Sequence, residues 1–236
     1  GKDSMVKEQA HTVRSYEQQL AQLRGMMVSM GRLVTQQTEQ AVAAVVEGDT
    51  EAGRAAQALD PQVDQLERDI ETLAIRLLAL RAPMAGDLRE IVAAMKISGD
   101  LERIGDCAAS VAKRALKVEA VPTDVPAGAL RSMGRLVQEN LRRAIDALDQ
   151  RDSARAVEVW QSDAAVDELY TAMFRELVTY MMEDPRTIRS CTHLLFIAKN
   201  LERIGDHATN IAERVYYAAT GEMLPTERPR GGASVR

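Results

Sequence analysis

An internal duplication restricts this chain to folds in which one unit is built twice. The hexapeptide Leu-Glu-Arg-Ile-Gly-Asp occurs at residues 101–106 and again at 201–206. A second string, Ser-Met-Gly-Arg-Leu-Val, occurs at 29–34 and again at 132–137. Self-similarity of this kind is the mark of a repeated structural unit. Each half of the chain should therefore adopt the same fold.

The spacing between matching residues locates a difference in length between the halves. The spacing is 103 residues over the first part of each half and 100 residues at the hexapeptide. Connections between elements tolerate such differences best, so we place this one between the second and third helices of each unit. The expected helices cover about 13–47, 50–80 and 84–117 in the first half and about 129–148, 152–182 and 185–217 in the second.

Local signals support these helices. Gly48 is followed by Asp49 and Thr50, a helix end followed by residues that cap a new helix. Asp184 before Pro185 predicts another helix start, because proline fits the first turn. Through the second segment, apolar residues recur three or four positions apart, which indicates one buried helix face. These residues are Val63, Leu66, Ile70, Leu73 and Leu77.

Composition favours the same fold class. Hydrophobic residues make up 46% of the 236 residues, which is enough to build a core. Aromatic residues make up only 3%, and no strand or hairpin pattern stands out. We therefore predict an all-α fold of two tandem antiparallel three-helix bundles that are related by the duplication.

The expected bundles occupy residues 5–117 and 129–218. Residues 118–128 contain two prolines and a glycine, a composition that predicts a linker between the bundles. Residues 219–236 are also rich in proline and glycine with few apolar residues, and we expect them to form a disordered tail. Residues 1–4 precede the first methionine and are interpreted as the remnant of an expression tag.

Charge and patterning exclude several functional classes. The formal net charge is −5, which leaves no basic field for nucleic acid, and the chain has few aromatic rings for base stacking. No apolar run is long enough to span a membrane and no signal segment opens the chain, so a cytoplasmic protein is expected. The only cysteines, Cys107 and Cys191, are expected to be free thiols within helices.

The acidic residues of the hexapeptide are the main candidates for a metal site. Successive helical residues are about 100° apart, so Glu102 and Asp106 project about 40° apart, on the side away from Ile104. Glu202 and Asp206 repeat this arrangement. Two carboxylates four residues apart offer hard oxygen ligands, which suit Mg, Mn, Ca or iron. We predict one such metal site in each half.

Aspartates of the second helix extend this prediction. Asp60 and Asp64 are four residues apart, and Asp163 and Asp167 repeat them at the 103-residue spacing. Antiparallel neighbours could bring them to the acids of the third helix. The alternative interpretation is an ordinary exposed network of ion pairs without metal.

Other residues of the hexapeptide helix leave alternatives open. Arg103 and Arg203 could pair with the acids or contact an anion or a partner. His207 could add a softer metal ligand, although Cys107 stands at the matching position. Gly105 and Gly205 lie in the middle of helices, where each costs about 1 kcal/mol relative to alanine. A close helix crossing or room for a ligand would explain both.

The chain resembles the PhoU family of phosphate-signalling regulators. The resemblance rests on both hexapeptides, on Asp87-Leu88-Arg89, and on the run from Thr179 to Asp184 that continues into Arg186-Thr187-Ile188. It spans most of residues 15–221. It implies tandem three-helix bundles and a negative regulator of the phosphate-starvation response and of phosphate uptake, which acts as an adaptor and not as an enzyme.

The resemblance also implies metals and partners. Family members carry metal clusters on acid-x-x-x-acid motifs, which correspond here to Glu102 with Asp106 and to Glu202 with Asp206. The metal could be Fe, Zn, Mn or Mg, in divalent or ferric form. The implied partners are the ATPase subunit of a phosphate ABC transporter and a sensor histidine kinase, reached at the membrane surface, and a second copy of the chain. The alternatives are a structural helical scaffold without metal and a carboxylate-bridged di-metal protein.

Overall fold

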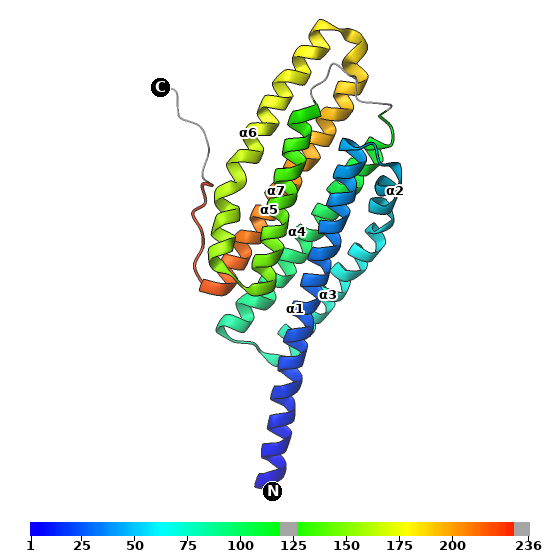
Figure 1. Cartoon of the computed structure of the whole chain (residues 1–236). Helices are drawn as coiled ribbons and strands as arrows, with labels where there is room; N and C mark the ends of the chain where they lie inside the picture. The colour runs from blue at the N-terminus through cyan, green and yellow to red at the C-terminus, as the bar shows by residue number, and fades with distance from the viewer. Residues whose placement is uncertain (119–126, 229–236) are drawn as a thin grey trace.

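The computed structural model describes residues 1–118 and 127–228, and within them every regular element is a helix (Figure 1). This confirms the predicted all-α class. None of the described helices is long and apolar enough to cross a membrane. The first half contains α1 Lys2–Val46, α2 Thr50–Ala58, α3 Asp60–Arg81 and α4 Ala85–Ala115; the second contains α5 Ala127–Gln150, α6 Ser153–Glu183, η1 Pro185–Thr187 and α7 Ile188–Thr220.

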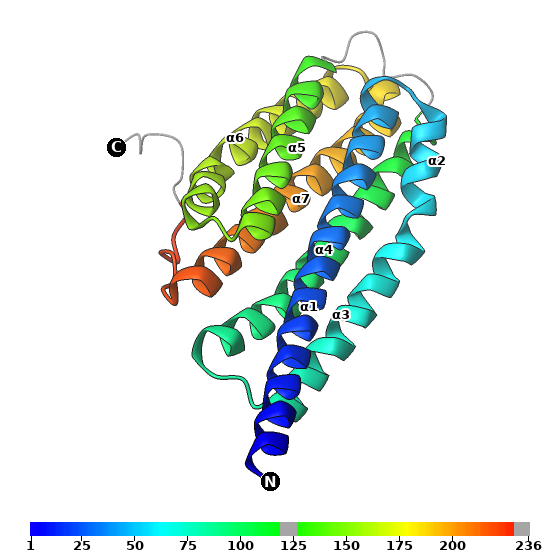
Figure 2. The ribbon, with the colours of Figure 1, turned by 60° about the horizontal axis from the view of Figure 1, so that its bottom comes forward.

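Helix α1 begins earlier than the sequence pattern indicated. It starts at Lys2 and not near residue 13, and its first part projects beyond the bundle as an isolated helix (Figures 1 and 2). Residues 1–14 are exposed, so no buried apolar face marks this stretch in the sequence. The segment 1–4, interpreted as a tag remnant, lies almost entirely within this helix.

The second segment of the first half is two helices, and the prediction of a single helix over 50–80 was wrong. Proline has no amide hydrogen and cannot continue the backbone ladder in a helix interior, and Pro61 lies at the start of α3. Leu59 keeps helical dihedral angles, φ −79° and ψ −18°, so α2 passes into α3 through a kink. Ala164 occupies the matching position in the second half, and α6 runs without interruption.

The turn before this segment is built in the same way in both halves. Asp49 caps α2 by accepting a hydrogen bond from the backbone amide of Ala52 at 3.0 Å. Asp152 caps α6 by accepting one from the amide of Arg155 at 3.1 Å. The capping role expected for Asp49 is confirmed, and the duplication extends to the chemistry of the turn.

The length difference between the halves falls where the sequence predicted it. Residues 82–84 separate α3 from α4, whereas Asp184 alone separates α6 from η1. Asp184 accepts a hydrogen bond from the amide of Arg186 at 3.0 Å and so caps the short helix that leads into α7.

The two bundles share a continuous core along α4 and α7. These helices lie side by side through the middle of the molecule (Figures 1 and 2), and no other pair of helices makes a more extensive contact. Apolar residues of the two hexapeptide helices are fully or almost fully buried there: Ile97, Leu101, Ile104, Ile197, Leu201 and Ile204. The predicted apolar seam is therefore buried, and the acids of the hexapeptides lie off the seam, toward α3 and α6.

Candidate functional site

Three carboxylates from two helices converge in the first half. Asp64 comes from α3, and Glu102 and Asp106 come from α4. One carboxylate oxygen from each residue lies within 4.8 Å of the other two. Glu102 is half-buried, whereas Asp106 is exposed. We call this group the first acid cluster.

The approach of α3 to α4 explains this convergence. Gly105 has no side chain and faces Val63 of α3: a Cβ atom on Gly105 would lie 3.2 Å from Val63 Cγ1. Val63 is fully buried, and Asp64 follows it at the rim. A close helix crossing, one of the two explanations offered for this glycine, is what the structure contains.

Two further acids border the first acid cluster. Asp60, one turn before Asp64, accepts a hydrogen bond from Nε2 of Gln37 at 3.1 Å. Burial raises the pKa of Glu67, and the negative charges of nearby acids, Asp64 and Asp106 among them, raise it further. Glu67 was not predicted as a site residue. Its signal in the sequence was the i, i+3 spacing from Asp64, which places both on one helix face.

The carboxylates of the first acid cluster repel one another strongly. Burial raises the pKa of Glu102 to about 8, and a hydrogen bond with Asp106 and the negative charge of Asp106 add to the effect. Burial also raises the pKa of Asp60, helped by Asp106 and Asp64. Within residues 1–118 and 127–228, no lysine, arginine or histidine forms a salt bridge with any of these five acids.

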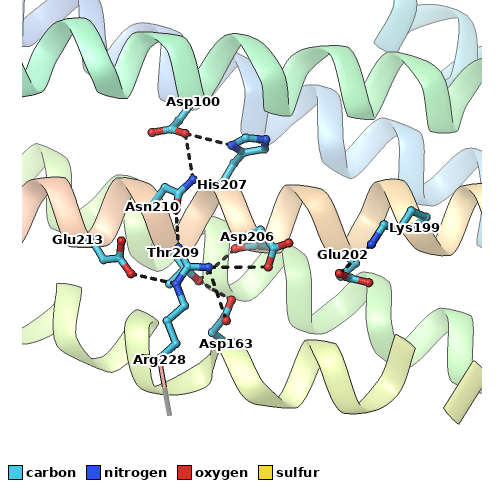
Figure 3. Close-up of polar contacts among 11 residues, drawn as sticks. Asp100, Asp163, Lys199, Glu202, Asp206, His207, Thr209, Asn210, Glu213 and Arg228 are labelled. Atoms are coloured by element: carbon cyan, nitrogen blue, oxygen red, sulfur yellow. Dashed lines mark hydrogen bonds and ion pairs between the residues drawn. The ribbon is translucent and has the colours of Figure 1, made fainter. Parts of the chain in front are cut away.

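The second half repeats the arrangement with different neighbours. Asp167 of α6 and Glu202 and Asp206 of α7 each place one carboxylate oxygen within 4.8 Å of the others. We call this group the second acid cluster. Asp163, at the position that matches Asp60, is buried and accepts a hydrogen bond from Oγ1 of Thr209 at 2.9 Å (Figure 3).

Two cations reach the second acid cluster. Lys199 Nζ lies 3.2 Å from Glu202 Oε1, and Gly99 occupies the matching position in the first half. Arg228, from the segment that follows α7, places Nη1 3.7 Å from Asp163 Oδ2 and 3.9 Å from Asp206 Oδ1 (Figure 3). Neither cation was predicted from the sequence.

Two carboxylate pKa values of the second acid cluster are also raised, but by less than that of Glu102 in the first. The pKa of Asp206 is raised to about 6, chiefly by burial and then by the charges of Asp163 and Asp167, against the opposing charge of Arg228. Burial is likewise the main cause that raises the pKa of Asp167. The Oε2 atom of Glu202 is buried and accepts no hydrogen bond from the described residues.

The remaining candidates of the hexapeptide helices lie apart from the acid clusters. His207 turns toward α4, where its Nδ1 atom lies 3.0 Å from Asp100 Oδ1 (Figure 3). Arg103 and Arg203 are exposed. The charge of Arg203 acts on the thiol of Cys107, but burial is the larger effect and raises the pKa of that thiol to about 11.

Asp100 is the centre of a buried network between the two bundles. Its side chain, only 5% exposed, accepts hydrogen bonds from Nε of Arg214 at 2.8 Å and from Nδ2 of Asn210 at 3.3 Å, in addition to the contact with His207. Burial works to raise the pKa of Asp100, but hydrogen bonds from His207, Arg214 and Asn210 outweigh it and lower the pKa. Asn200, the matching residue in the second half, has no such role and bonds within its own helix.

The two acid clusters fit a hard metal ion. Carboxylate oxygens are the ligands that Mg²⁺, Mn²⁺, Ca²⁺ and iron prefer. Oε2 of Glu202 accepts no hydrogen bond from the described residues. Burial and neighbouring negative charges raise the pKa values of Glu102 and Asp206, and in the second cluster Lys199 and Arg228 offset the negative charge only in part. A cation placed among these carboxylates would relieve their repulsion.

Comparisons with known proteins agree with one another. A sequence model of the PhoU domain matches residues 27–115 and 130–215. The phosphate-specific transport system accessory protein PhoU homolog of Caulobacter vibrioides is 51% identical over 221 residues, which cover 93% of this chain and 96% of that protein.

Solved structures give the same result. The crystal structure of PhoU from Pseudomonas aeruginosa aligns with a TM-score of 0.85 at 40% identity and covers 88% of this chain and 100% of that one. The crystal structure of the phosphate transport system regulatory protein PhoU from Streptococcus pneumoniae aligns with a TM-score of 0.80 at 30% identity and covers 89% of this chain and 99% of that one.

Proposed function

The chain belongs to the PhoU family, and from this premise we propose that it is an accessory protein of a phosphate transport system. In this role it represses phosphate uptake and the phosphate-starvation response while phosphate is plentiful. The names of its relatives, which describe accessory and regulatory proteins of phosphate transport, support the proposal. It acts as an adaptor and not as an enzyme, since the acid clusters carry no catalytic constellation.

The partners follow from this role. The chain contacts the ATPase subunit of a phosphate ABC transporter and a sensor histidine kinase, and it associates with the membrane surface from the cytoplasm through them. A second copy of the chain is a further partner. Helical bundles with long exposed helix faces suit such docking.

The acid clusters are metal sites in this proposal. Asp64, Glu102 and Asp106 hold one ion, and Asp167, Glu202 and Asp206 hold another, with Asp60 and Asp163 as bordering acids. The observation that carries this assignment is the convergence of three carboxylates from two helices, twice, at positions that match in the duplication. The ion supplies positive charge that ties α3 to α4 and α6 to α7, which fixes the surfaces that partners meet.

Elemental analysis tests the metal assignment. The variant with Glu102→Ala, Asp106→Ala, Glu202→Ala and Asp206→Ala should retain its helical circular dichroism but lose the metal that co-purifies with the wild type in the absence of chelator. A control variant with Glu39→Ala and Asp184→Ala removes acids outside both clusters and should keep the metal. Equal metal content in all three proteins would reject the assignment and favour a structural scaffold.

Gene deletion tests the regulatory role separately. A strain that lacks the protein should express phosphate-starvation genes in phosphate-rich medium, and the wild-type gene should restore repression. The quadruple variant should fail to restore it if the metal sites serve regulation. Normal repression in the deletion strain would contradict the proposed regulatory function whatever the metal content.

A further inference from the structure

The segment after α7 folds back along the helix that precedes it. Gly221 has φ +74° and ends α7 in the left-handed region, where glycine carries no steric penalty. The chain then returns over α7 toward the second acid cluster. Leu224 and Arg228 are half-buried, whereas the other residues of the segment 222–228 are exposed.

Few contacts hold this segment in place. A cavity of about 380 Å³ lies between the segment and residues of α4 and α7, among them Lys96, Glu213 and Tyr217. The segment therefore arches over the helices and contacts them closely only near its two half-buried residues. Such a poorly packed segment can detach at low cost in free energy.

The guanidinium group of Arg228 is the main attachment (Figure 3). Its Nε atom donates a hydrogen bond to Glu213 Oε1 at 2.9 Å, and Nη2 donates one to Asn210 Oδ1. Its Nη1 atom faces Asp163 and Asp206, at 3.7 and 3.9 Å. The side chain is only 24% exposed, so most of its charge is balanced by these acids and not by water.

The first acid cluster has no equivalent cation. Across the described parts of the chain, Asp60, Asp64 and the acids beside them form no salt bridge, as shown above. The duplication thus supplies two similar sets of carboxylates, and among the residues described up to Arg228 the C-terminal segment brings an arginine to the second set only.

We infer that Arg228 is a built-in counter-cation of the second acid cluster, and that the docked segment 222–228 and a divalent ion at Asp167, Glu202 and Asp206 exclude one another. The inference rests on the proposed metal sites. A divalent ion on Asp206 would face the guanidinium charge across a single carboxylate group, and like charges at that distance repel one another. The ion and the arginine also compete for the same acid.

Two consequences follow from this exclusion. The first acid cluster should fill at a lower metal concentration than the second, because it has one more bordering acid, Glu67, and no competing cation among the described residues. Binding at the second cluster should release the segment, and by reciprocity the docked segment should weaken metal binding there by the same factor. The protein would then respond to metal in two steps, and only the second would expose the face of α7 that Arg228 covers.

Titration of site-isolated variants with Mn²⁺ tests the first consequence. Asp64→Asn with Glu102→Gln and Asp106→Asn leaves only the second cluster, and Asp167→Asn with Glu202→Gln and Asp206→Asn leaves only the first. Adding Arg228→Ala should lower the Kd for Mn²⁺ roughly tenfold in the protein that retains the second cluster. It should leave the Kd of the other protein unchanged. Arg228→Lys keeps the charge and should restore much of the wild-type Kd, whereas Arg186→Ala, which removes an exposed arginine paired with Asp184, should change neither.

Proteolysis of the full chain tests the second consequence. A protease that cleaves after glutamate can cut at Glu222 and Glu227, which lie within the segment, and the rate of cleavage reports how often the segment is detached. Mn²⁺ should accelerate these cuts several-fold in the wild type. In the Arg228→Ala variant the cuts should already be fast and insensitive to Mn²⁺.

The outcomes separate this inference from the proposal on which it rests. Binding of Mn²⁺ at both clusters with no effect of Arg228→Ala on the second Kd would overturn the inference and leave the metal sites standing. Failure of both site-isolated variants to bind Mn²⁺ would reject the metal sites themselves. Cleavage after Glu227 that does not change with Mn²⁺, in a protein whose second cluster binds the ion, would also overturn the exclusion.

Discussion

Val63 of α3 lies directly against the backbone of Gly105 of α4. A Cβ atom on Gly105 would lie 3.2 Å from Val63 Cγ1 and 3.0 Å from Oε1 of Gln37, which is tighter than ordinary packing. At the matching crossing in the second half, a Cβ atom on Gly205 would lie 3.4 Å from Val166 Cγ1, an ordinary contact. A side chain at Gly105 would therefore require its neighbours to shift by a few tenths of an ångström, whereas one at Gly205 would meet ordinary contacts.

This difference predicts opposite effects of one substitution. Replacing a mid-helix glycine with alanine stabilises a helix by about 1 kcal/mol, whereas overpacking a tight contact costs about 1 to 3 kcal/mol. Gly105→Ala should therefore lower the free energy of unfolding by about 1 kcal/mol, and Gly205→Ala should raise it by up to about 1 kcal/mol. Urea unfolding in the presence of chelator measures both. Equal effects of the two substitutions would show that the crossings are equally tight.

The helical period and the duplication together made the acid clusters predictable. The i, i+4 spacing places Glu102 beside Asp106 on one face, and the aspartates of the preceding helix share that spacing. The duplication supports this prediction further, since a chance pattern of acids would not recur at matching positions in the two halves. Antiparallel packing of neighbouring helices then predicts that Asp64 can meet Glu102 and Asp106, and that their counterparts can meet in the second half, as the structure has them.

What the sequence did not reveal depends on contacts between residues far apart in the chain. Arg214 reaches Asp100 across 114 residues, and no local rule relates two such positions. The segment 219–236 was expected to be disordered from its composition, yet its described part brings Arg228 to the second acid cluster. Composition indicates whether a segment can build a core of its own, but it does not indicate whether one arginine finds an acidic partner on a neighbouring helix.

The buried network around Asp100 should contribute strongly to stability. Asp100→Ala removes a buried carboxylate together with its hydrogen bonds to Arg214, Asn210 and His207, and a hydrogen bond to a charged group contributes about 1.5 to 3 kcal/mol. Since the Arg214 side chain is 34% exposed and regains water, we expect a loss of about 2 kcal/mol in the free energy of unfolding. As a control, Asp149→Ala removes an exposed pair with Arg32 and should change stability by less than about 1 kcal/mol. Similar losses in the two variants would mean that the network is not effectively buried.

The stability of the metal-free protein should fall as the pH rises from about 5 to about 8. Burial raises the pKa of Glu102 from 4.5 to about 8 and that of Asp206 from 3.8 to about 6. Because the folded state holds these protons more tightly than the unfolded state, their stabilising contribution is complete below the unfolded pKa. It is lost as the pH passes through the folded pKa.

Thermal unfolding in chelator at a series of pH values measures this effect. The wild type should show a falling Tm between pH 5.5 and 8.5, and Glu102→Gln, which carries no titrating proton, should flatten the upper part of the curve. A wild-type Tm that is constant or rises over this range would contradict the raised pKa values.

Both cysteines should resist thiol reagents in the native state. Cys191 is fully buried, Cys107 is 9% exposed, and burial raises the pKa of Cys107 to about 11. Only a thiolate reacts, and at pH 7.4 almost none of Cys107 is in that form, while burial keeps reagents away from Cys191. A colorimetric thiol assay should therefore detect no thiol in the folded protein within minutes and both after denaturation. Rapid reaction of one equivalent would show that the helix carrying that cysteine opens readily.

The turn between α5 and α6 should store strain at Arg151. This residue has φ +54°, and the matching residue of the first half is Gly48 with φ +66°. A side chain in the left-handed region costs about 1 to 2 kcal/mol relative to glycine. In this conformation the Nη2 atom of Arg151 donates a hydrogen bond to Glu90 Oε2 at 3.1 Å. Glu90 also accepts a hydrogen bond from Arg24 of the first bundle.

Two substitutions at this position separate the strain from the ion pair. Arg151→Ala loses the contact with Glu90 and keeps the strained backbone, whereas Arg151→Gly loses the contact and relieves the strain. The glycine variant should therefore unfold with a free energy about 1 kcal/mol higher than the alanine variant and close to that of the wild type. Gly48→Ala introduces the same strain in the first half and should cost a similar amount. If the alanine variant matched the glycine variant, the positive φ would carry no cost, and Arg151 would be held in this turn by its contact with Glu90 alone.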